Sequence, residues 1–222
     1  MSQVSAIIPA AGTGTRFGEL KQFKSLAGLP LLFHCLSPFF LSRIIKEIIV
    51  IVQNDKIEFT KKGIQALKFE KKTKIVTGGE KRQDSVKNGI LASSNTTELV
   101  CIHDAARPFV TKNLINKSVS SCKSADGVVI ACPSVDTVKL SHNGFIRKTI
   151  DRNDIWLAQT PQTFKKDKLI KAIDNAHNLG LIGTDESVLM EEMGYSIKLV
   201  KGDKNNFKIT TVHDWERAKS LI

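Results

Sequence analysis

The sequence predicts an α/β fold of the Rossmann-like, three-layer kind, with a mainly parallel sheet, helices on both of its faces and a projecting β-hairpin arm. Short runs rich in isoleucine and valine alternate along the chain with segments of helical spacing. Parallel strands need crossover connections, and right-handed crossovers place helices on both faces of the sheet. An Asn-Gly pair between two alternating runs predicts the hairpin. The 222 residues suit a single domain that spans 1–222.

The first half of the chain carries the clearest alternation. Five apolar runs bounded by polar residues or glycine are expected to be buried strands, at 6–9, 47–52, 74–76, 99–102 and 128–131. Segments with apolar residues at helical spacing lie between them, at about 30–41, 56–68, 84–92 and 111–123. Strand and helix repeated in this way indicate a doubly covered parallel sheet.

The alternation stops at the segment 133–153, which we expect to be the β-arm. Two runs, 136–140 and 145–150, flank His142-Asn143-Gly144, and Asn-Gly is a strong hairpin signal. An isolated two-stranded ribbon is only marginally stable in water. We therefore expect the arm to pack on a second subunit and to serve dimerisation.

The last third of the chain returns to helix and strand. Helices are expected near 165–178 and 185–193, followed by a strand at 196–200. A closing helix should begin near Thr211, because Thr211 and Asp214 have the spacing of a capping box.

The amino-acid composition limits the classes of partner that the protein is expected to bind. Lys and Arg number 33 against 22 Asp and Glu, so the formal net charge is +11, which favours nucleic acid, membrane headgroups or phosphorylated small molecules. Aromatic residues make up only 6%, which disfavours a base-stacking surface for single-stranded nucleic acid. One lysine cluster is expected to be a solvated face, with a nucleic-acid contact as the alternative, and it comprises Lys61, Lys62, Lys68, Lys71, Lys72 and Lys74.

The remaining composition predicts a cytoplasmic protein. The four cysteines form no C-x-x-C pair and no zinc spacing, so we expect reduced thiols. The longest apolar stretch, 29–41, is interrupted by Pro30, His34 and Pro38 and is too short to span a bilayer. The first predicted strand begins almost at the N-terminus and leaves no room for a targeting peptide.

A glycine-rich loop at 10–22 follows the first predicted strand. Sheet topology places it at the carboxyl ends of the strands, where open α/β folds bind ligands. Its glycines let backbone N–H groups approach an anion, and Arg16 and Lys21 add positive charge. The spacing G-x-G-x-x-x-G differs from the dinucleotide motif, and no G-K-[ST] of a P-loop follows. A nucleoside triphosphate is the favoured ligand; a dinucleotide and a plain structural turn remain the alternatives.

Two further polar segments follow predicted strands. In the first, at 78–85, Asp84 or Ser85 could line a pocket or simply cap the next helix. In the second, at 103–108, Asp104 is a natural magnesium ligand beside a triphosphate, and Arg107 could bind ligand or pair with Asp104. His103 has no evident proton to transfer, so a structural role is expected for it.

Taken in order, these blocks are similar to the 2-C-methyl-D-erythritol 4-phosphate cytidylyltransferases of the non-mevalonate isoprenoid pathway. The resemblance covers nearly the whole chain, and no single block is specific alone. The matching blocks are 10–22, 78–86, 103–108, 136–139, 151–153, 159–162, 184–186 and 206–210.

The resemblance implies a single nucleotidyltransferase domain that converts CTP and 2-C-methyl-D-erythritol 4-phosphate into 4-diphosphocytidyl-2-C-methyl-D-erythritol and pyrophosphate. It implies a Mg²⁺ or other divalent cation near Asp104, and no nucleic acid or membrane partner. The implied catalytic residues are Arg16, Lys21 and Lys208. The implied CTP-binding residues are Ala10, Ala11, Gly12, Gly14, Gly79, Glu80, Ser85 and Ala105. The implied residues for the second substrate are Asp104, Arg107, Thr137, Arg152, Thr160 and Thr184.

In the family that this chain resembles, the arm crosses to the other subunit of a homodimer, so Thr137 and Arg152 would bind phosphate there. The chain departs from the family pattern at Leu20, where proline is common, and in the short spacing between Arg16 and Lys21. A ribitol-5-phosphate or other polyol-phosphate cytidylyltransferase is the alternative within the class. A nucleotide-sensing or nucleic-acid-binding protein is the alternative outside it.

Overall fold

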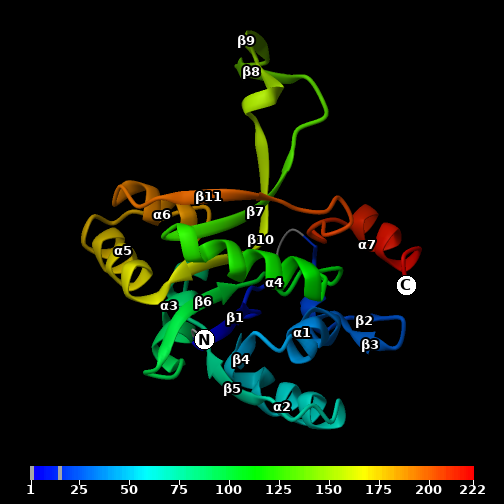
Figure 1. The fold of residues 1–222 in the computed structure, drawn as a ribbon. Helices are drawn as coiled ribbons and strands as arrows, with labels where there is room; N and C mark the ends of the chain where they lie inside the picture. The colour runs from blue at the N-terminus through cyan, green and yellow to red at the C-terminus, as the bar shows by residue number, and fades with distance from the viewer. Residues whose placement is uncertain (1–2, 15–16) are drawn as a thin grey trace.

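The structure, a computed structural model, describes residues 3–14 and 17–222 and is built around one large sheet (Figure 1). Four strand pairs in this sheet are parallel. The seven strands lie in the order β11 (Ile197–Lys201), β7 (Gly127–Pro133), β10 (Trp156–Lys165), β6 (Thr97–Ile102), β1 (Gln3–Pro9), β4 (Ile45–Val52) and β5 (Lys72–Thr77). The predicted α/β fold with a mainly parallel sheet is confirmed.

Helices cover both faces of the sheet, as the crossover rule predicts. One face packs against α1 (Leu31–Leu41), α2 (Ile57–Ala66) and α4 (Lys112–Ser121). The opposite face packs against α3 (Arg82–Ala92), α5 (Lys166–Asn178) and α6 (Glu186–Glu192). The helix boundaries differ from the predicted ones by a few residues, which is usual for helix ends.

Strand β4 shows why the sequence folds into three layers. Ile48, Val50 and Val52 pack into the first core, and Ile49 and Ile51 pack into the second. Successive side chains of a strand point to opposite faces, so a strand between two helical layers must be apolar throughout. The unbroken run of Ile and Val in β4 is therefore the sequence signature of burial on both sides.

Strand β10 is the main element that the sequence analysis did not predict. It is antiparallel to both of its neighbours, β6 and β7. Gln159, Pro161 and Gln162 break the apolar pattern, and proline normally argues against a central strand. The register with β7 shifts between Ala158 and Gln162, and this irregularity accommodates Pro161 inside the sheet.

The predicted hairpin is present and projects from the sheet (Figure 1). Strands β8 (Val138–His142) and β9 (Phe145–Ile150) are antiparallel and form a separate two-stranded sheet. Asn143 and Gly144 both have positive φ, 48° and 82°, as a tight hairpin turn requires. Phe145 and Ile146 at the tip are 78% and 66% exposed, so this chain alone leaves apolar surface uncovered on the arm.

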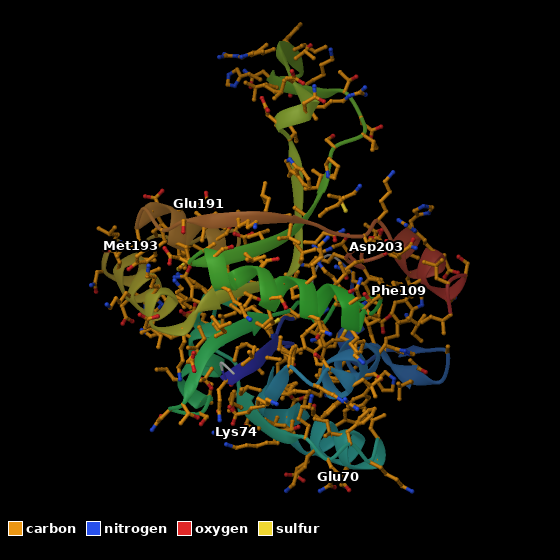
Figure 2. The ribbon with its side chains drawn as sticks, viewed as in Figure 1. Glu70, Lys74, Phe109, Glu191, Met193 and Asp203 are labelled. Carbon is orange, nitrogen blue, oxygen red and sulfur yellow. The ribbon has the colours of Figure 1, made fainter. Side chains whose placement is uncertain are left out.

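A smaller core closes the C-terminal side of the molecule. Leu26 and Leu31 pack with Ile209 and Trp215 of the last segment, beside the short hairpin β2 (Ser25–Leu26) and β3 (Leu29–Pro30). Phe109 packs against this core, and its ring is tilted against that of Phe207, with centroids 5.4 Å apart. Figure 2 shows Phe109 beside the C-terminal helix. This packing ties the segment before α7 (Val212–Lys219) to the sheet.

Helix α7 begins with the predicted capping box. The Thr211 hydroxyl accepts a hydrogen bond from the Asp214 N–H at 3.1 Å, and the Asp214 carboxylate accepts from the Thr211 N–H at 2.8 Å. Burial acts to raise the pKa of Asp214, but the hydrogen bonds from Thr210 and Thr211 lower it to about 2. Because this pKa is lower in the folded state, the carboxylate stabilises the fold above its ordinary pKa of 3.8, and this stabilisation is lost as the pH falls through about 2.

We expect Thr211→Ala to lower the free energy of unfolding by about 1 kcal/mol, because alanine leaves the Asp214 N–H without its acceptor. Thr211→Ser retains the hydroxyl and is the matched control, with a smaller expected loss. Urea unfolding at neutral pH measures both variants. An alanine variant as stable as the wild type would show that this cap contributes nothing.

No helix in the described part of the chain is long and apolar enough to cross a membrane. The four cysteines are free thiols, and Cys35, Cys101 and Cys122 are buried. Burial raises the pKa of the Cys122 thiol to about 11, so this thiol is protonated and unreactive at neutral pH.

Candidate active site

A cavity of about 310 Å³ lies at the carboxyl ends of β1, β5 and β6. The loops that follow these strands supply most of its lining, as expected for an open α/β sheet. Eleven of the residues predicted from the sequence line it, namely Ala10, Ala11, Gly12, Gly14, Lys21, Gly79, Glu80, Ser85, Asp104, Ala105 and Lys208. Arg16 lies outside the described residues.

The loop after β1 is braced by a glutamine. The Gln22 side-chain amide donates to the carbonyl oxygens of Ala10 and Gly12, at 2.9 and 2.8 Å. Gly14 has φ +72°, and a Cβ atom there would overlap the carbonyl oxygen of Glu19. These constraints turn the backbone toward the cavity, where Lys21 also lies. Gln22 belongs to the loop motif, but this bracing role could not be predicted from the motif, since it depends on the folded loop.

The loop after β5 forms the opposite wall. A Cβ atom on Gly78 would overlap Ala11, so glycine lets the two loops approach each other. The Ser85 hydroxyl accepts from the Gly79 N–H at 3.0 Å, which leaves its own proton available to a ligand. Asp84 accepts from the Lys81 N–H at 3.1 Å and takes the capping role that the sequence left open between Asp84 and Ser85.

Asp104 lies at the centre of a cluster of basic side chains. Its Oδ2 is 2.8 Å from Lys208 Nζ and 3.8 Å from Arg107 Nε, and its Oδ1 is 3.2 Å from Arg82 Nη2. Burial opposes ionisation, but Arg82, Lys208 and Arg107 together hold the pKa of Asp104 well below its usual range. Asp104 is therefore a carboxylate at neutral pH, and it brings Arg82 and Lys208, from two distant segments, next to Arg107 of its own turn.

Arg107 and Thr160 are buried behind the cavity lining in this chain. Arg107 donates to the Asn206 carbonyl at 2.9 Å and so braces the segment that carries Lys208. The Thr160 hydroxyl accepts from the Asp104 N–H at 3.0 Å and lies 2.9 Å from Nδ1 of His103. Both residues hold Asp104 and Lys208 in place, and their predicted contacts with the second substrate stay predictions.

His103 fits the structural role expected for it. Burial lowers its pKa to about 4, so the ring is neutral at physiological pH. Its Nε2 lies 3.0 Å from the Arg107 carbonyl oxygen, to which it donates, and Nδ1 then accepts from the hydroxyl of Thr160. The ring thereby fixes the turn that carries Asp104.

Thr137, Arg152 and Thr184 do not line the cavity of this chain. Thr137 is exposed at the base of the arm, and Arg152 donates to the Val135 carbonyl at 3.0 Å. Thr184 is exposed just before Asp185, the residue that caps α6. Their predicted roles toward the second substrate stay predictions, and those of Thr137 and Arg152 require a second copy of the chain.

Two residues of the site had no role assigned from the sequence. Arg82 lines the cavity and connects Asp104 to Glu186, whose Oε1 is 2.6 Å from Arg82 Nη1. Both lie in blocks that support the family resemblance, so the signal was present, but it did not indicate that they pair. Glu186 is 104 positions away from Arg82 and becomes its partner only in the folded chain.

The comparisons with known proteins agree with this geometry. The family model of 2-C-methyl-D-erythritol 4-phosphate cytidylyltransferase matches residues 4–222. The protein of that name from Caldanaerobacter subterraneus is 41% identical over 99% of this chain and 98% of its own length. The one from Geobacter metallireducens is 38% identical, over 99% of this chain and 97% of its own length.

Solved structures give the same result for the fold. The 4-diphosphocytidyl-2C-methyl-D-erythritol synthase of Anaerococcus prevotii superposes with a TM-score of 0.89 at 29% identity, covering 99% of this chain and 98% of that one. The Francisella tularensis 2-C-methyl-D-erythritol 4-phosphate cytidylyltransferase superposes with a TM-score of 0.83 at 31% identity, covering 100% of both chains. With a family model and relatives that match over nearly the whole length, the chain belongs to the 2-C-methyl-D-erythritol 4-phosphate cytidylyltransferase family.

Proposed function

We propose that this chain transfers the cytidylyl group of CTP to the phosphate of 2-C-methyl-D-erythritol 4-phosphate. A phosphate oxygen of the acceptor attacks the α-phosphorus of CTP, the bond to the β-phosphate oxygen breaks, and pyrophosphate leaves. The products are 4-diphosphocytidyl-2-C-methyl-D-erythritol and pyrophosphate. The observation that carries this proposal is the cavity in which a glycine loop, Lys21 and Lys208 meet. Family membership supports it.

The loop after β1 and the loop after β5 suit different parts of the nucleotide. The small residues from Ala10 to Gly14 leave backbone N–H groups near the cavity, which suits a triphosphate. Gly79 and Ser85 on the opposite wall suit a cytosine base, because the base offers an amino donor and ring acceptors. The free proton of the Ser85 hydroxyl can reach one such acceptor, and Glu80 lies beside them.

The protein lowers the activation barrier of the transfer by placing positive charges close to the reacting phosphates. The attacking phosphate is already an anion, so the reaction needs no general base, which agrees with the neutral and buried His103. Negative charge accumulates around the α-phosphorus while two polyanions approach each other. Fixed cations offset this charge, and we assign that role to Arg16, Lys21 and Lys208.

The residues that line the cavity fit a divalent cation held largely by the substrate. Among residues 3–14 and 17–222 no group of three or more His, Cys, Asp or Glu side chains is arranged around a common point. Asp104 supplies one ionised carboxylate, and Mg²⁺ commonly takes one or two carboxylates together with phosphate oxygens. A bound Mg²⁺ would neutralise triphosphate charge and polarise the α-phosphate.

The second substrate requires residues from two copies of the chain in this proposal. Arg107 and Thr160 lie buried behind the cavity lining of one copy, and Thr184 is exposed. Thr137 and Arg152 belong to the arm, which projects from the sheet (Figure 1). A homodimer whose arms exchange would bring an arginine fork to the acceptor phosphate. The apolar tip residues Phe145 and Ile146 would then gain a cover.

Arg152→Ala is expected to raise the KM for the polyol phosphate about 10–100-fold, because a hydrogen-bonded charge contact is lost. The KM for CTP should stay unchanged. Arg147→Ala, also on the arm and exposed, is the matched control. Steady-state kinetics with each substrate varied in turn measures both values. An equal rise of both KM values would show that Arg152 does not act on the acceptor.

Mixing subunits tests whether the arm acts across the dimer. Lys21→Ala removes a cation of the nucleotide site, and Arg152→Ala removes the arm contact. In an equal mixture that exchanges subunits, about a quarter of the sites combine an intact nucleotide site with an intact arm. Activity near that level supports exchange of arms, and no recovery contradicts it.

A pyrophosphate-release assay with CTP tests the proposed function as a whole. We expect turnover with 2-C-methyl-D-erythritol 4-phosphate to exceed turnover with ribitol 5-phosphate and other polyol phosphates. Preference for ribitol 5-phosphate would show that the protein is a ribitol-5-phosphate cytidylyltransferase instead. Calorimetry that detects tight binding of duplex DNA and none of CTP would reject the enzyme.

A further inference from the structure

Arg82 connects two acidic side chains through one guanidinium group. Its Nε and Nη2 donate to the same oxygen of Asp104, Oδ1, at 3.3 and 3.2 Å. Its Nη1 donates to Glu186 Oε1 at 2.6 Å. A guanidinium carries five N–H donors in a rigid plane, so these contacts fix its orientation and leave donors directed elsewhere.

Glu186 is the fixed end of this chain of contacts. It is 1% exposed at the start of α6, and its Oε2 has no hydrogen-bond partner among the residues that the structure describes. Burial raises the pKa of Glu186, and Arg82 counteracts this effect. A buried carboxylate that loses its single charged partner destabilises the fold strongly. The contact between Glu186 and Arg82 is therefore expected to persist in the folded protein.

The contact with Arg82 fixes the orientation of the Asp104 carboxylate. Arg82 binds Oδ1 from the side of α3, and Lys208 binds Oδ2 from the segment before α7. With Oδ1 engaged by Arg82, Oδ2 is the oxygen that contacts Lys208. The ammonium group of Lys208 is therefore kept at one edge of Asp104, on the cavity wall.

We propose that Arg82 is a positioning residue for the reaction, and that Glu186 acts through it. Arg82 orients Asp104, and Asp104 in turn places Lys208 for the α-phosphate. This inference rests on the proposed function. It adds a Glu186–Arg82–Asp104–Lys208 series, with both carboxylates buried and both cations half-buried, that joins α6, α3, the turn after β6 and the segment before α7.

The substitution Arg82→Lys separates position from charge. Lysine keeps the positive charge near the triphosphate but cannot bridge two carboxylates with a planar fork. We expect kcat to fall about 10–100-fold, as it does when groups that orient an active-site ligand are removed. The KM for CTP, and CTP affinity by calorimetry without a divalent cation, should change less than about threefold, because the substitution keeps a positive charge beside the nucleotide.

Glu186→Gln and the double variant test the order of the series. Glu186→Gln should lower kcat in the same manner but less. The double variant Arg82→Lys, Glu186→Gln should be no slower than Arg82→Lys alone, since residues that act through one another are not additive. Multiplication of the two losses would show that Glu186 acts independently and would overturn the series.

The controls remove charge from the same helices outside the site. Lys87→Gln, on α3, breaks the pair that Lys87 forms at 2.8 Å with Asp174 of α5. Glu191→Gln changes an exposed residue of α6 (Figure 2). Both should keep kcat within about twofold of the wild type, because isolated surface charges contribute little. Thermal melting of every variant identifies loss of folding.

The outcomes distinguish this inference from the proposed function. A wild-type protein that releases no pyrophosphate with any polyol phosphate rejects the function itself. An active wild type with an equally active Arg82→Lys variant rejects the positioning role. A variant that loses CTP affinity with kcat unchanged shows instead that Arg82 is a nucleotide contact, which also overturns the inference.

Discussion

Replacing Lys21 with alanine is expected to lower kcat about 10²–10³-fold while leaving the fold intact, in line with the loss of a single electrostatic donor at a transition state. Lys21 lines the cavity next to the glycine loop, and its Nζ lies 5.7 Å from the centroid of the Phe17 ring. An alanine at this position removes a positive charge where the triphosphate accumulates negative charge. Pyrophosphate release at saturating CTP measures the effect.

Lys24→Ala is the matched control for this experiment. Lys24 is close in sequence to Lys21, but it pairs with Glu19 and lies over the ring of Trp215, at 5.3 Å from the centroid. It does not line the cavity. Kinetics of the control should match those of the wild type. A Lys21→Ala enzyme that retains near wild-type turnover would remove Lys21 from the catalytic residues.

Asp104→Asn is expected to affect both stability and activity. Asparagine removes the buried negative charge that Arg82, Arg107 and Lys208 surround, and leaves one buried and two half-buried cations close together. Breaking a buried charge pair in this way costs about 3–5 kcal/mol of stability. Turnover should fall about 10–100-fold as well, because Lys208 loses the carboxylate that positions it.

The effect of CTP on the melting temperature provides a second test of Asp104→Asn. The triphosphate of CTP is an anion that can take the place of the missing carboxylate among the cations. CTP should therefore raise the melting temperature of Asp104→Asn more than that of the wild type. Asp174→Asn, at a partly exposed surface pair, should change neither value appreciably. An Asp104→Asn protein as stable as the wild type would show that the cluster does not depend on this charge.

The parts of the fold that the sequence predicts are those in which one local pattern determines the structure. Within the predicted strand at 47–52, residues 48–52 are all apolar because this part of the strand is buried on both faces. The Asn143-Gly144 turn requires positive φ at both residues, and few sequences satisfy this requirement. By contrast, β10 contains two glutamines and a proline, and only its neighbours β6 and β7 make it a strand.

The same distinction applies to the site. The glycine loop and Asp104 were predictable because they follow strand ends, and all strand ends of one direction meet at one edge of a parallel sheet. The pairing of Arg82 with Glu186 was not predictable, because no local pattern connects residues that far apart. The bracing amide of Gln22 is similar, since its two acceptors exist only once the loop has folded.

Strand β10 has a practical consequence for handling the protein. Its first residues pair with the end of β7 at the root of the arm, whereas Thr160, further along the same strand, holds the backbone of Asp104. The hairpin turn at Asn143 and Gly144 lies beyond this anchored stretch and touches none of the cavity lining. A fluorophore attached at that turn would report on the arm, and neither it nor an affinity tag there would disturb the pairing of β10 with β7 or the contact of Thr160 with Asp104.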